Sequence, residues 1–466
     1  MKKTNFKLSL LLLIPFAGIA VAQGQTAKFT QSDIVSSLPD GSGNYEKAIG
    51  HFTSMSHLSY FLGTDTAAYI LDPSTGVKIV VAKDGRHYER ARIYKADPKD
   101  RYDSVIAAAG DGNGQLVAYL NPANSNGGNA NAAWGRYVIY GGSGCHDLHV
   151  QDFDGDGKLD VACSGTFNDN DAPAIMMFQN ASNDWTGPID VIKAGDAIAP
   201  VAVNGVNGGA RNNLVGCDGN TLYWYENSGR GPNWPRKAIG DCNQGAALAT
   251  LNVGNRDIVL QAANESEPSQ WSSGFAYFDP GPADNPLSWT KIVIDHTYTS
   301  VHEIACGTFN GTAFCTVGEQ EQASAKCNME GQNTQSDNGG SYRGCRVAIY
   351  VWNGNGFNAP TIISNKGTQN QQLYNNGDAE YMAGANHCVL GGYDCAYHLW
   401  KFTFDTNAAA AGDVGLQGPQ GDTTRSGKEK EQPSKITIYF QDFLRRHKRI
   451  KTYTENLVRW MIGIVE

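Results

Sequence analysis

A nine-residue acidic stretch, residues 152–160, holds the side chains of this chain best suited to binding a cation. Its carboxylates fall at positions 1, 3, 5 and 9 of the stretch, with glycines between them, and belong to Asp152, Asp154, Asp156 and Asp160. Ca²⁺ takes six to eight oxygen ligands, and alternating acidic residues on one short loop supply them. Position 12 is Cys163, where an EF-hand has a bidentate glutamate, and the flanking residues have strand-like patterns. We therefore predict a calcium-binding β-turn between two strands; the alternative is a solvated acidic turn that binds no metal.

Two histidines stand at matching places in two similar segments, His146-Asp-Leu-His and His302-Glu-Ile-Ala. Imidazoles that converge with carboxylates can bind a transition metal or act as general acid and base on a sugar ring. The catalytic candidates are His146, His302, Glu303 and Tyr381, the last as a proton donor in an elimination. The predicted ligand-binding residues are His57, His146, His302, Glu319 and Glu380. The alternative interpretation is that these side chains only satisfy backbone groups where repeats meet.

Residues 1–22 have the features of a secretory signal peptide: a basic start, an apolar run and small residues ahead of Gln23. The apolar run is too short to span a membrane, so we expect a secreted, extracellular protein without a transmembrane segment. The ten cysteines suit an oxidising compartment. Neighbouring cysteines can pair as Cys145–Cys163, Cys217–Cys242, Cys306–Cys315, Cys327–Cys345 and Cys388–Cys395. In a eukaryotic host the protein would be a glycoprotein, with acceptor sites at Asn180, Asn264 and Asn310.

The composition predicts an all-β protein and argues against nucleic acid as a partner. Only 18% of the residues are charged, the net charge is −9, and glycine is abundant at 54 residues. A negative chain is repelled by the phosphate backbone. A polar, glycine-rich body with many aromatic residues is typical of short strands joined by turns.

A repeat runs through residues 23–405. An aromatic residue precedes a short β-branched run six times, at steps of 46 to 68 residues, beginning at Tyr88, Trp134, Trp185, Trp234, Trp289 and Phe357. This spacing suits the outer strand of a four-stranded β-propeller blade, with the tryptophans packing between blades. A further strand, 397–404, has no outer strand behind it, whereas Phe29–Val35 resembles an unpaired outer strand. We predict seven blades, with the last blade closed by this N-terminal strand; six blades is the alternative.

The composition changes after residue 405. Glycines at a three-residue period in residues 406–435 have a collagen-like register, but so few triplets predict a flexible linker. Residues 436–466 mix aromatic residues with the basic run Arg445–Arg449. This segment could form a basic amphipathic helix that makes weak contact with a membrane surface.

The stretch Asp152-Phe-Asp-Gly-Asp-Gly-Lys-Leu-Asp160 followed by a β run resembles the FG-GAP/VCBS repeat family of secreted β-propellers. The phrases Trp224-Tyr-Glu-Asn-Ser and Tyr277-Phe-Asp-Pro-Gly are similar to blades of the same family, and the resemblance covers about residues 28–405. It implies a propeller fold and a structural calcium on Asp152, Asp154, Asp156 and Asp160. It does not imply one activity, because the family includes adhesion heads, lectins, and sugar dehydratases or polysaccharide lyases.

The expected function is that of a secreted, calcium-stabilised propeller that binds extracellular glycan or another surface ligand. The channel mouth and a polar insertion, residues 319–343, would form the binding face. Two alternatives remain open. One is a polysaccharide lyase or sugar dehydratase acting at the channel mouth, and the other is an adhesion module for a surface protein.

Overall fold

The computed structural model has an all-β fold. It describes residues 26–35 and 44–405, apart from single-residue and short gaps and the longer gaps 165–172, 202–212, 263–273, 282–287, 320–333, 336–340 and 386–396. The chain divides into two compact units, 1–410 and 411–466, and the second lies outside the described residues. Within the described part the one helical segment is the 3₁₀ turn η1 (Pro122–Asn124).

Seven four-stranded antiparallel sheets account for nearly all described strands. From inner to outer strand, the first is β2 (Asn44–Gly50), β3 (Ser59–Thr64), β4 (Ala68–Asp72) and β5 (Val77–Ala82). The second is β6 (Tyr88–Tyr94), β7 (Ser104–Ala109), β8 (Gln115–Leu120) and β9 (Gly135–Gly141). The third is β10 (Asp147–Gln151), β11 (Asp160–Ser164), β12 (Pro173–Gln179) and β13 (Trp185–Lys193). The fourth is β14 (Ile198–Val201), β15 (Asn213–Asp218), β16 (Thr221–Tyr225) and β17 (Arg236–Asp241).

The remaining sheets follow in chain order. The fifth is β18 (Ala247–Asn252), β19 (Asp257–Ala262), β20 (Phe275–Asp279) and β21 (Thr290–Asp295). The sixth is β22 (Val301–Phe309), β23 (Thr312–Glu319), β26 (Val347–Val351) and β27 (Thr361–Ser364). The seventh is β28 (Asn370–Asn375), β29 (Glu380–Ala385), β30 (Tyr397–Asp405) and β1 (Thr26–Val35). A small hairpin, β24 (Thr334–Gln335) with β25 (Ser341–Tyr342), lies in the insertion after β23.

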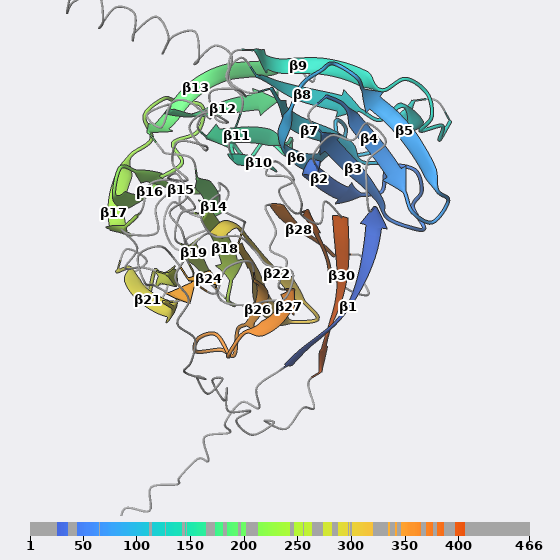
Figure 1. The fold of residues 1–466 in the computed structure, drawn as a ribbon. Coiled ribbons are helices and arrows are strands. Elements are labelled where there is room, and N and C mark those ends of the chain that lie inside the picture. The colour runs from blue at the N-terminus through green and yellow to red at the C-terminus, as the bar shows by residue number, and fades with distance from the viewer. Residues whose placement is uncertain are drawn as a thin grey trace, which may run out of the picture. The chain divides into compact units, whose positions relative to one another are not determined.

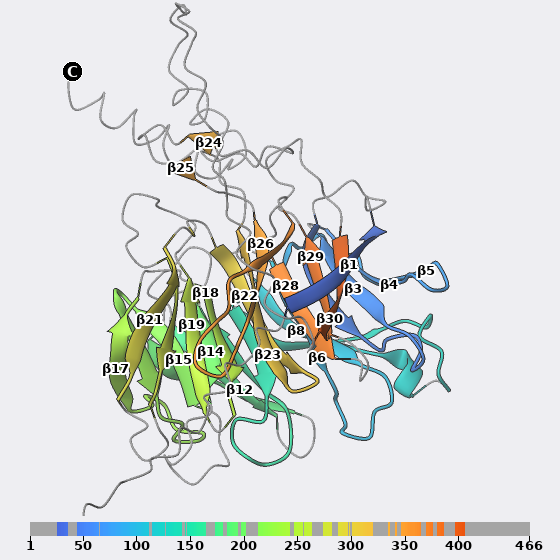
Figure 2. The same ribbon diagram turned by 90° about the horizontal axis from the view of Figure 1, so that it is seen from below.

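The first strands of successive sheets contact one another in a closed circuit. The contacts run β2, β6, β10, β14, β18, β22, β28 and back to β2, which is the arrangement of a β-propeller around a central channel (Figure 1). The N-terminal strand β1 pairs antiparallel with β30, Phe29 lying opposite Phe402. The prediction that an N-terminal strand closes the last sheet is therefore confirmed, and the two strands lie side by side in Figure 2.

Middle strands are apolar because both of their faces are covered. Every residue of β7 (SVIAAA) and β11 (DVACS) is buried, whereas β9 is exposed at five of its seven positions. Core clusters combine residues of neighbouring sheets: Phe61 of β3 lies in one cluster with Val105 of β7 and Trp134. Trp134 and Trp234 are buried, as expected for tryptophans that pack between blades.

Neighbouring sheets are also joined by buried amides placed at the end of the third strand. Asn121, directly after β8, is 3% exposed. Its Nδ2 donates to the carbonyls of Phe52 and Asp103, each at 2.9 Å, and its Oδ1 accepts from Ala123 N at 3.0 Å. Since Phe52 belongs to the preceding sheet, Asn121 links two sheets through otherwise unsatisfied backbone groups.

The same link recurs in other sheets. Asn227, after β16, donates from Nδ2 to the carbonyl of Phe153 in the preceding sheet at 2.7 Å. Gln179, at the end of β12, donates from Nε2 to the Tyr94 hydroxyl of the preceding sheet at 2.7 Å. The repeated polar residue at the end of the third strand therefore has a structural role between sheets.

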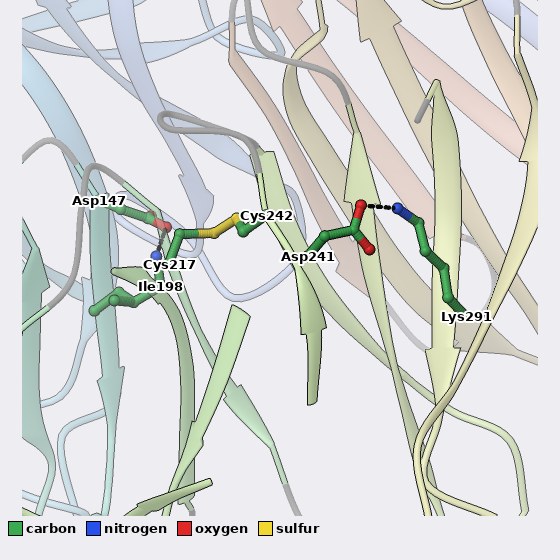
Figure 3. Close-up of a disulfide and its surroundings, with 6 residues drawn as sticks. All are labelled: Asp147, Ile198, Cys217, Asp241, Cys242 and Lys291. Atoms are coloured by element: carbon green, nitrogen blue, oxygen red, sulfur yellow. Dashed lines mark hydrogen bonds and ion pairs between the residues drawn. A yellow bond between two sulfur atoms is a disulfide. The ribbon is translucent and has the colours of Figure 1, made fainter. Parts of the chain in front are cut away.

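Three of the predicted disulfides are confirmed: Cys145–Cys163, Cys217–Cys242 and Cys306–Cys315. Cys217–Cys242 ties β15 to the end of β17 (Figure 3). Beside it, Lys291 Nζ of β21 donates to Asp241 Oδ2 of β17 at 2.7 Å and so joins the outer strands of adjacent sheets. The predicted pairs Cys327–Cys345 and Cys388–Cys395 lie outside the described residues.

One strand assignment from the sequence is wrong. Tyr88–Tyr94 was expected to be an outer strand, but it is β6, the inner strand of the second sheet, and β5 is the outer strand of the first. Tyr88 is fully buried and its hydroxyl lies 2.7 Å from that of Tyr119. The aromatic residue is therefore part of the core rather than the start of an exposed outer strand, and Arg90 and Arg92 of the same strand line the channel cavity.

Within the described part of the chain there is no helix with the length and apolar character needed to span a bilayer. The signal peptide predicted at 1–22, the linker at 406–435 and the basic segment at 436–466 lie outside the described residues.

Candidate functional site

A cavity of about 260 Å³ lies where six of the inner strands converge. Four strands supply a polar wall, which consists of Arg90, Arg92, Asp147, His149, Glu303, Gln371 and Gln372. The strands β14 and β18 supply a mainly apolar wall, which includes Ala197, Ala199, Pro200, Ala247, Leu248 and Ala249. The cavity is therefore amphipathic, with charged groups on one side and small apolar side chains on the other.

Arg92 of β6 is the cation at the centre of the polar wall. Its guanidinium lies 3.6 Å from Glu46 Oε1, 3.6 Å from Glu303 Oε1 and 4.0 Å from Asp147 Oδ1. These separations exceed the length of a hydrogen bond, so the three carboxylates balance its charge without taking up its N–H donors. Its one close partner among the described residues is the carbonyl of Ala91, which accepts from Nη1 at 2.9 Å.

Asp147 and His149 of β10 form the next part of the wall. Burial alone would raise the pKa of Asp147, but the nearby His149, Arg90 and Arg92 outweigh it and hold that pKa below its usual value. Asp147 Oδ2 also accepts from the Ile198 N–H of the next inner strand at 3.3 Å (Figure 3).

The proton position on His149 follows from its partners. Nε2 lies 2.8 Å from the carbonyl of Ile198, which can only accept, so Nε2 carries the proton. In the neutral imidazole Nδ1 is then an acceptor, and within the described residues it has no hydrogen-bond partner. In its neutral form His149 therefore offers the cavity a free acceptor.

Gln371 of β28 is 3% exposed and fixed by Glu303 of the preceding inner strand. Its backbone N–H donates to Glu303 Oε2, and its Nε2 donates to the Glu303 carbonyl at 3.0 Å. Its Oε1 is buried and has no hydrogen-bond partner among the described residues. A buried acceptor left unpaired is costly. Gln371 is one of the residues that line the cavity.

Two buried residues of opposite charge, Glu46 and Lys47, are adjacent on β2, and Glu46 lies 3.6 Å from Arg92. Glu46 and Lys47 are 2% and 1% exposed. Burial raises the pKa of Glu46 to about 7, against the opposing effect of Lys47, Arg90 and Arg92. Burial lowers the pKa of Lys47 to about 8, against the opposing effect of Glu46 and Glu303.

The predicted channel residues are placed as follows. Glu303 lines the cavity. Glu319 is fully buried at the end of β23 and lies 3.4 Å from Arg346 Nε, in an ion pair. His146 lies outside the described residues. So do the side chains of His302 on β22 and of Glu380 and Tyr381 on β29.

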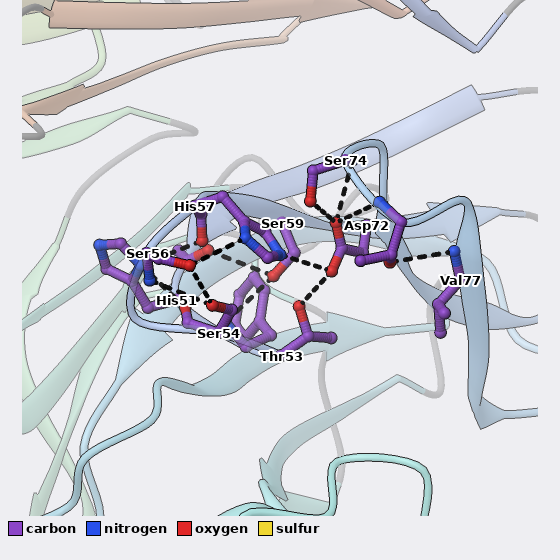
Figure 4. Close-up of polar contacts among 12 residues, drawn as sticks. His51, Thr53, Ser54, Ser56, His57, Ser59, Asp72, Ser74 and Val77 are labelled. Carbon is purple, nitrogen blue, oxygen red and sulfur yellow. Dashed lines mark hydrogen bonds and ion pairs between the residues drawn. The ribbon is translucent and has the colours of Figure 1, made fainter.

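His57 lies in the connection between β2 and β3 and does not line the cavity. Its Nε2 is 2.7 Å from Asp72 Oδ2, while Thr53 and Ser74 also donate to Asp72 (Figure 4). Burial alone would raise the pKa of Asp72, but hydrogen bonds from Ser74, His57 and Thr53 hold it below its usual value. The network ties the β2–β3 connection to the β4–β5 turn, which is a structural role.

Arg92, His149 and Gln371 were missed by the sequence analysis. Polar residues at alternating positions of an inner strand face the channel, as Arg90 and Arg92 do on β6 and Asp147 and His149 on β10. This signal was present in the sequence. Arg92 was missed because its segment was assigned to an outer strand.

The acidic stretch forms the turn between β10 and β11, as predicted. One carboxylate oxygen from each of Asp152, Asp154 and Asp156 lies within 4.8 Å of the other two. Asp152 accepts from the N–H groups of Gly155 at 2.7 Å and Gly157 at 2.8 Å, which shapes the turn. Both glycines have positive φ, 80° and 85°, a conformation that favours glycine.

Asp160 has a different position from the other three carboxylates. It is fully buried and accepts from the backbone N–H groups of Phe153, Asp154 and Gln179 at 2.9 to 3.2 Å. Burial raises its pKa to about 7, against the opposing effect of these hydrogen bonds. Asp160 therefore holds the turn against β12, whereas the other three carboxylates are grouped at the turn.

Arg230, from the β16–β17 connection of the next sheet, reaches the acidic turn. Its Nε donates to Asp154 Oδ2 at 2.6 Å, and its Nη2 lies 3.4 Å from Asp156 Oδ2. A guanidinium thus contacts two of the carboxylates that a divalent cation would use.

No family model matches the chain. No curated protein matches it either. Similar solved structures include a chain of the mitotic checkpoint complex, at 10% identity over 86% of this chain and 98% of that chain, with a TM-score of 0.46. An Agrocybe aegerita lectin that recognises non-reducing terminal N-acetylglucosamine is 14% identical over 70% of this chain and 81% of that chain, with a TM-score of 0.44. The PQQ-bound aldose sugar dehydrogenase of Streptomyces coelicolor is 11% identical over 82% of this chain and all of that chain, with a TM-score of 0.41. Function is therefore inferred from this chain's own residues.

Proposed function

We propose that this protein is a secreted, calcium-stabilised, seven-bladed β-propeller of the FG-GAP/VCBS type that binds an extracellular glycan in its channel cavity. Each four-stranded sheet is taken as one blade, and seven such sheets with a closed circuit of inner strands support seven blades over six. Three disulfides support an oxidising compartment.

The observation that carries the glycan proposal is the amphipathic cavity with unused polar groups on one wall. Sugar hydroxyls both donate and accept, so they suit a wall that includes Arg92, with unused donors, and Gln371, whose Oε1 is unpaired. The opposite wall of alanines and Leu248 suits the C–H face of a sugar ring. A volume of about 260 Å³ is below that of most drug-sized sites, which favours one sugar unit over a larger ligand.

The calcium proposal rests on the donor set of the β10–β11 turn. Three carboxylates with converging oxygens are the hard ligands that Ca²⁺ prefers, and Asp152, Asp154 and Asp156 would hold it. A bound Ca²⁺ would neutralise their mutual repulsion and stiffen the turn. Because Phe153 of this turn packs with Trp234 of the next blade, that stiffening would stabilise the contact between blades.

A second candidate function is sugar chemistry at the same cavity, by a lyase or a dehydratase. The specific observation that favours it is the free Nδ1 of His149, which could accept a proton from a bound sugar. Such an enzyme would release an unsaturated product, which absorbs ultraviolet light, and a His149→Gln variant would lose that product.

The experiment is a glycan-array screen of the full chain, with Ca²⁺ and with chelator. We expect glycan binding by wild type, loss of binding in Gln371→Leu, and unchanged binding in Gln115→Leu, a half-buried glutamine on β8 outside the cavity. Absence of glycan binding by the folded protein would refute the proposed ligand. A melting temperature that chelation leaves unchanged would refute the proposed calcium.

A further inference from the structure

We infer that the cavity selects an uncharged sugar, recognised through a pair of neighbouring hydroxyls, over a uronate, a sulfated sugar or an amino sugar. This inference rests on the proposed function, since it names the ligand class of the same site. It follows from the charge balance of the cavity and from the hydrogen-bonding capacity that its walls leave unused.

The charges around the cavity are already balanced. Arg90 and Arg92 line the cavity together with Asp147 and Glu303, and the adjacent buried residues Glu46 and Lys47 of β2 have one charge of each sign. All three carboxylates lie within 4.0 Å of Arg92. A ligand charge of either sign would enter this partly dehydrated network without a counter-charge of its own, and burying an uncompensated charge is costly.

The unused hydrogen-bonding groups are of both kinds. Arg92 has donors without a close side-chain acceptor, and Gln371 Oε1 is an acceptor without a donor, each considered among the described residues. A ligand carboxylate would satisfy Arg92 but leave Gln371 Oε1 unpaired, and an ammonium group would do the reverse. A hydroxyl can accept from the first and donate to the second.

The two residues share one neighbour in the cavity wall. Both contact Glu303: Arg92 lies 3.6 Å from Glu303 Oε1, and Gln371 donates to the Glu303 backbone carbonyl at 3.0 Å. A sugar ring whose neighbouring hydroxyls bind both residues would present its C–H face to Ala197, Ala199 and Ala247 on the opposite wall.

The test compares three glycans that differ only at the terminal sugar, which is neutral, a uronate or an amino sugar. Binding to the full chain is measured by calorimetry at low and at high salt. We expect the neutral glycan to bind at least about tenfold more tightly than either charged form. Its affinity should change by less than about twofold with salt, because no ligand charge is screened.

Two substitutions separate the contributions. Gln371→Leu removes the unpaired acceptor and should weaken neutral-glycan binding by about tenfold or more, while Gln115→Leu should not. Gln371→Glu keeps an acceptor but adds a negative charge, so it should shift the binding preference towards the amino sugar. This variant also provides a test if Gln371→Leu does not fold.

The outcomes distinguish the inference from the proposed function. Tighter, salt-sensitive binding of the uronate or of the amino sugar would overturn the inference and leave glycan binding intact. Neutral-glycan binding that Gln371→Leu does not weaken would overturn the assignment of this site. Failure of all three glycans to bind a folded protein would overturn the proposed function itself.

Discussion

Replacing Asn121 with alanine should destabilise the propeller by an amount that its hydrogen bonds allow us to estimate. The change removes the side-chain partner of three backbone groups, the carbonyls of Phe52 and Asp103 and the N–H of Ala123. Asn121 itself is only 3% exposed. Each buried group left unpaired costs about 1–3 kcal/mol. Partial access of water should keep the total near the lower end, at about 4 kcal/mol.

The expected shift in melting temperature follows from the size of the propeller. For about 380 residues, the entropy of unfolding is about 0.8 kcal/mol/K, so about 4 kcal/mol corresponds to roughly 5 °C. Differential scanning calorimetry measures this shift. Asn121→Asp should cost at least as much, because it would place a carboxylate against two carbonyl oxygens.

The matched control is Asn252→Ala. Asn252 is exposed, and among the described residues its side chain donates only to Asp257 Oδ1, at 2.8 Å, so its loss should cost less than about 0.5 kcal/mol. If Asn121→Ala lowers the melting temperature no more than Asn252→Ala does, the buried amides do not hold adjacent blades together.

Three further predictions follow. Gly240→Ala should lower the melting temperature by several degrees, because a Cβ at Gly240 would collide with the ring of Phe278 on the next sheet; an unchanged value would contradict that packing. Burial raises the folded-state pKa of Glu46 to about 7, above its unfolded value, so its contribution to stability should fall as pH rises between about 4.5 and 7. Between about pH 5 and 7 the free energy of unfolding of wild type should fall by about 2 kcal/mol more than that of Glu46→Gln, as measured by chemical unfolding. If the two proteins lose the same free energy over this range, the prediction is refuted. Arg230→Ala should tighten Ca²⁺ binding several-fold by calorimetry, since Arg230 contacts Asp154 and Asp156; an unchanged affinity would show that it does not compete.

Features carried by local pattern were predictable from the sequence. The strand after residue 396 with no outer partner, together with the spare strand at residues 29–35, indicated the closure of the last sheet by β1. Cysteines on neighbouring strands gave three correct disulfides. The acidic turn was found because all of its carboxylates lie on one loop.

The channel site was harder to predict from the sequence, for a physical reason. Its polar wall is assembled from β6, β10, β22 and β28, so no two of its strands are adjacent in sequence. An inner strand that faces a polar channel alternates polar and apolar residues just as an outer strand facing solvent does. Arg90 and Arg92 on β6 therefore looked like surface residues, and the partners of Gln371 could not be inferred from spacing.

The pairing of β1 with β30 has a consequence for the order in which the chain acquires its structure. During synthesis β1 is made first, yet its partner is the last strand of the propeller, so β1 must wait for almost the whole domain. Until then, both strands have unpaired edges that can join other chains. Contacts so distant in sequence form slowly, since loop closure must precede them. The yield of folded protein should therefore fall as the protein concentration during refolding rises. A fragment lacking residues 26–35 should aggregate rather than simply melt at a lower temperature.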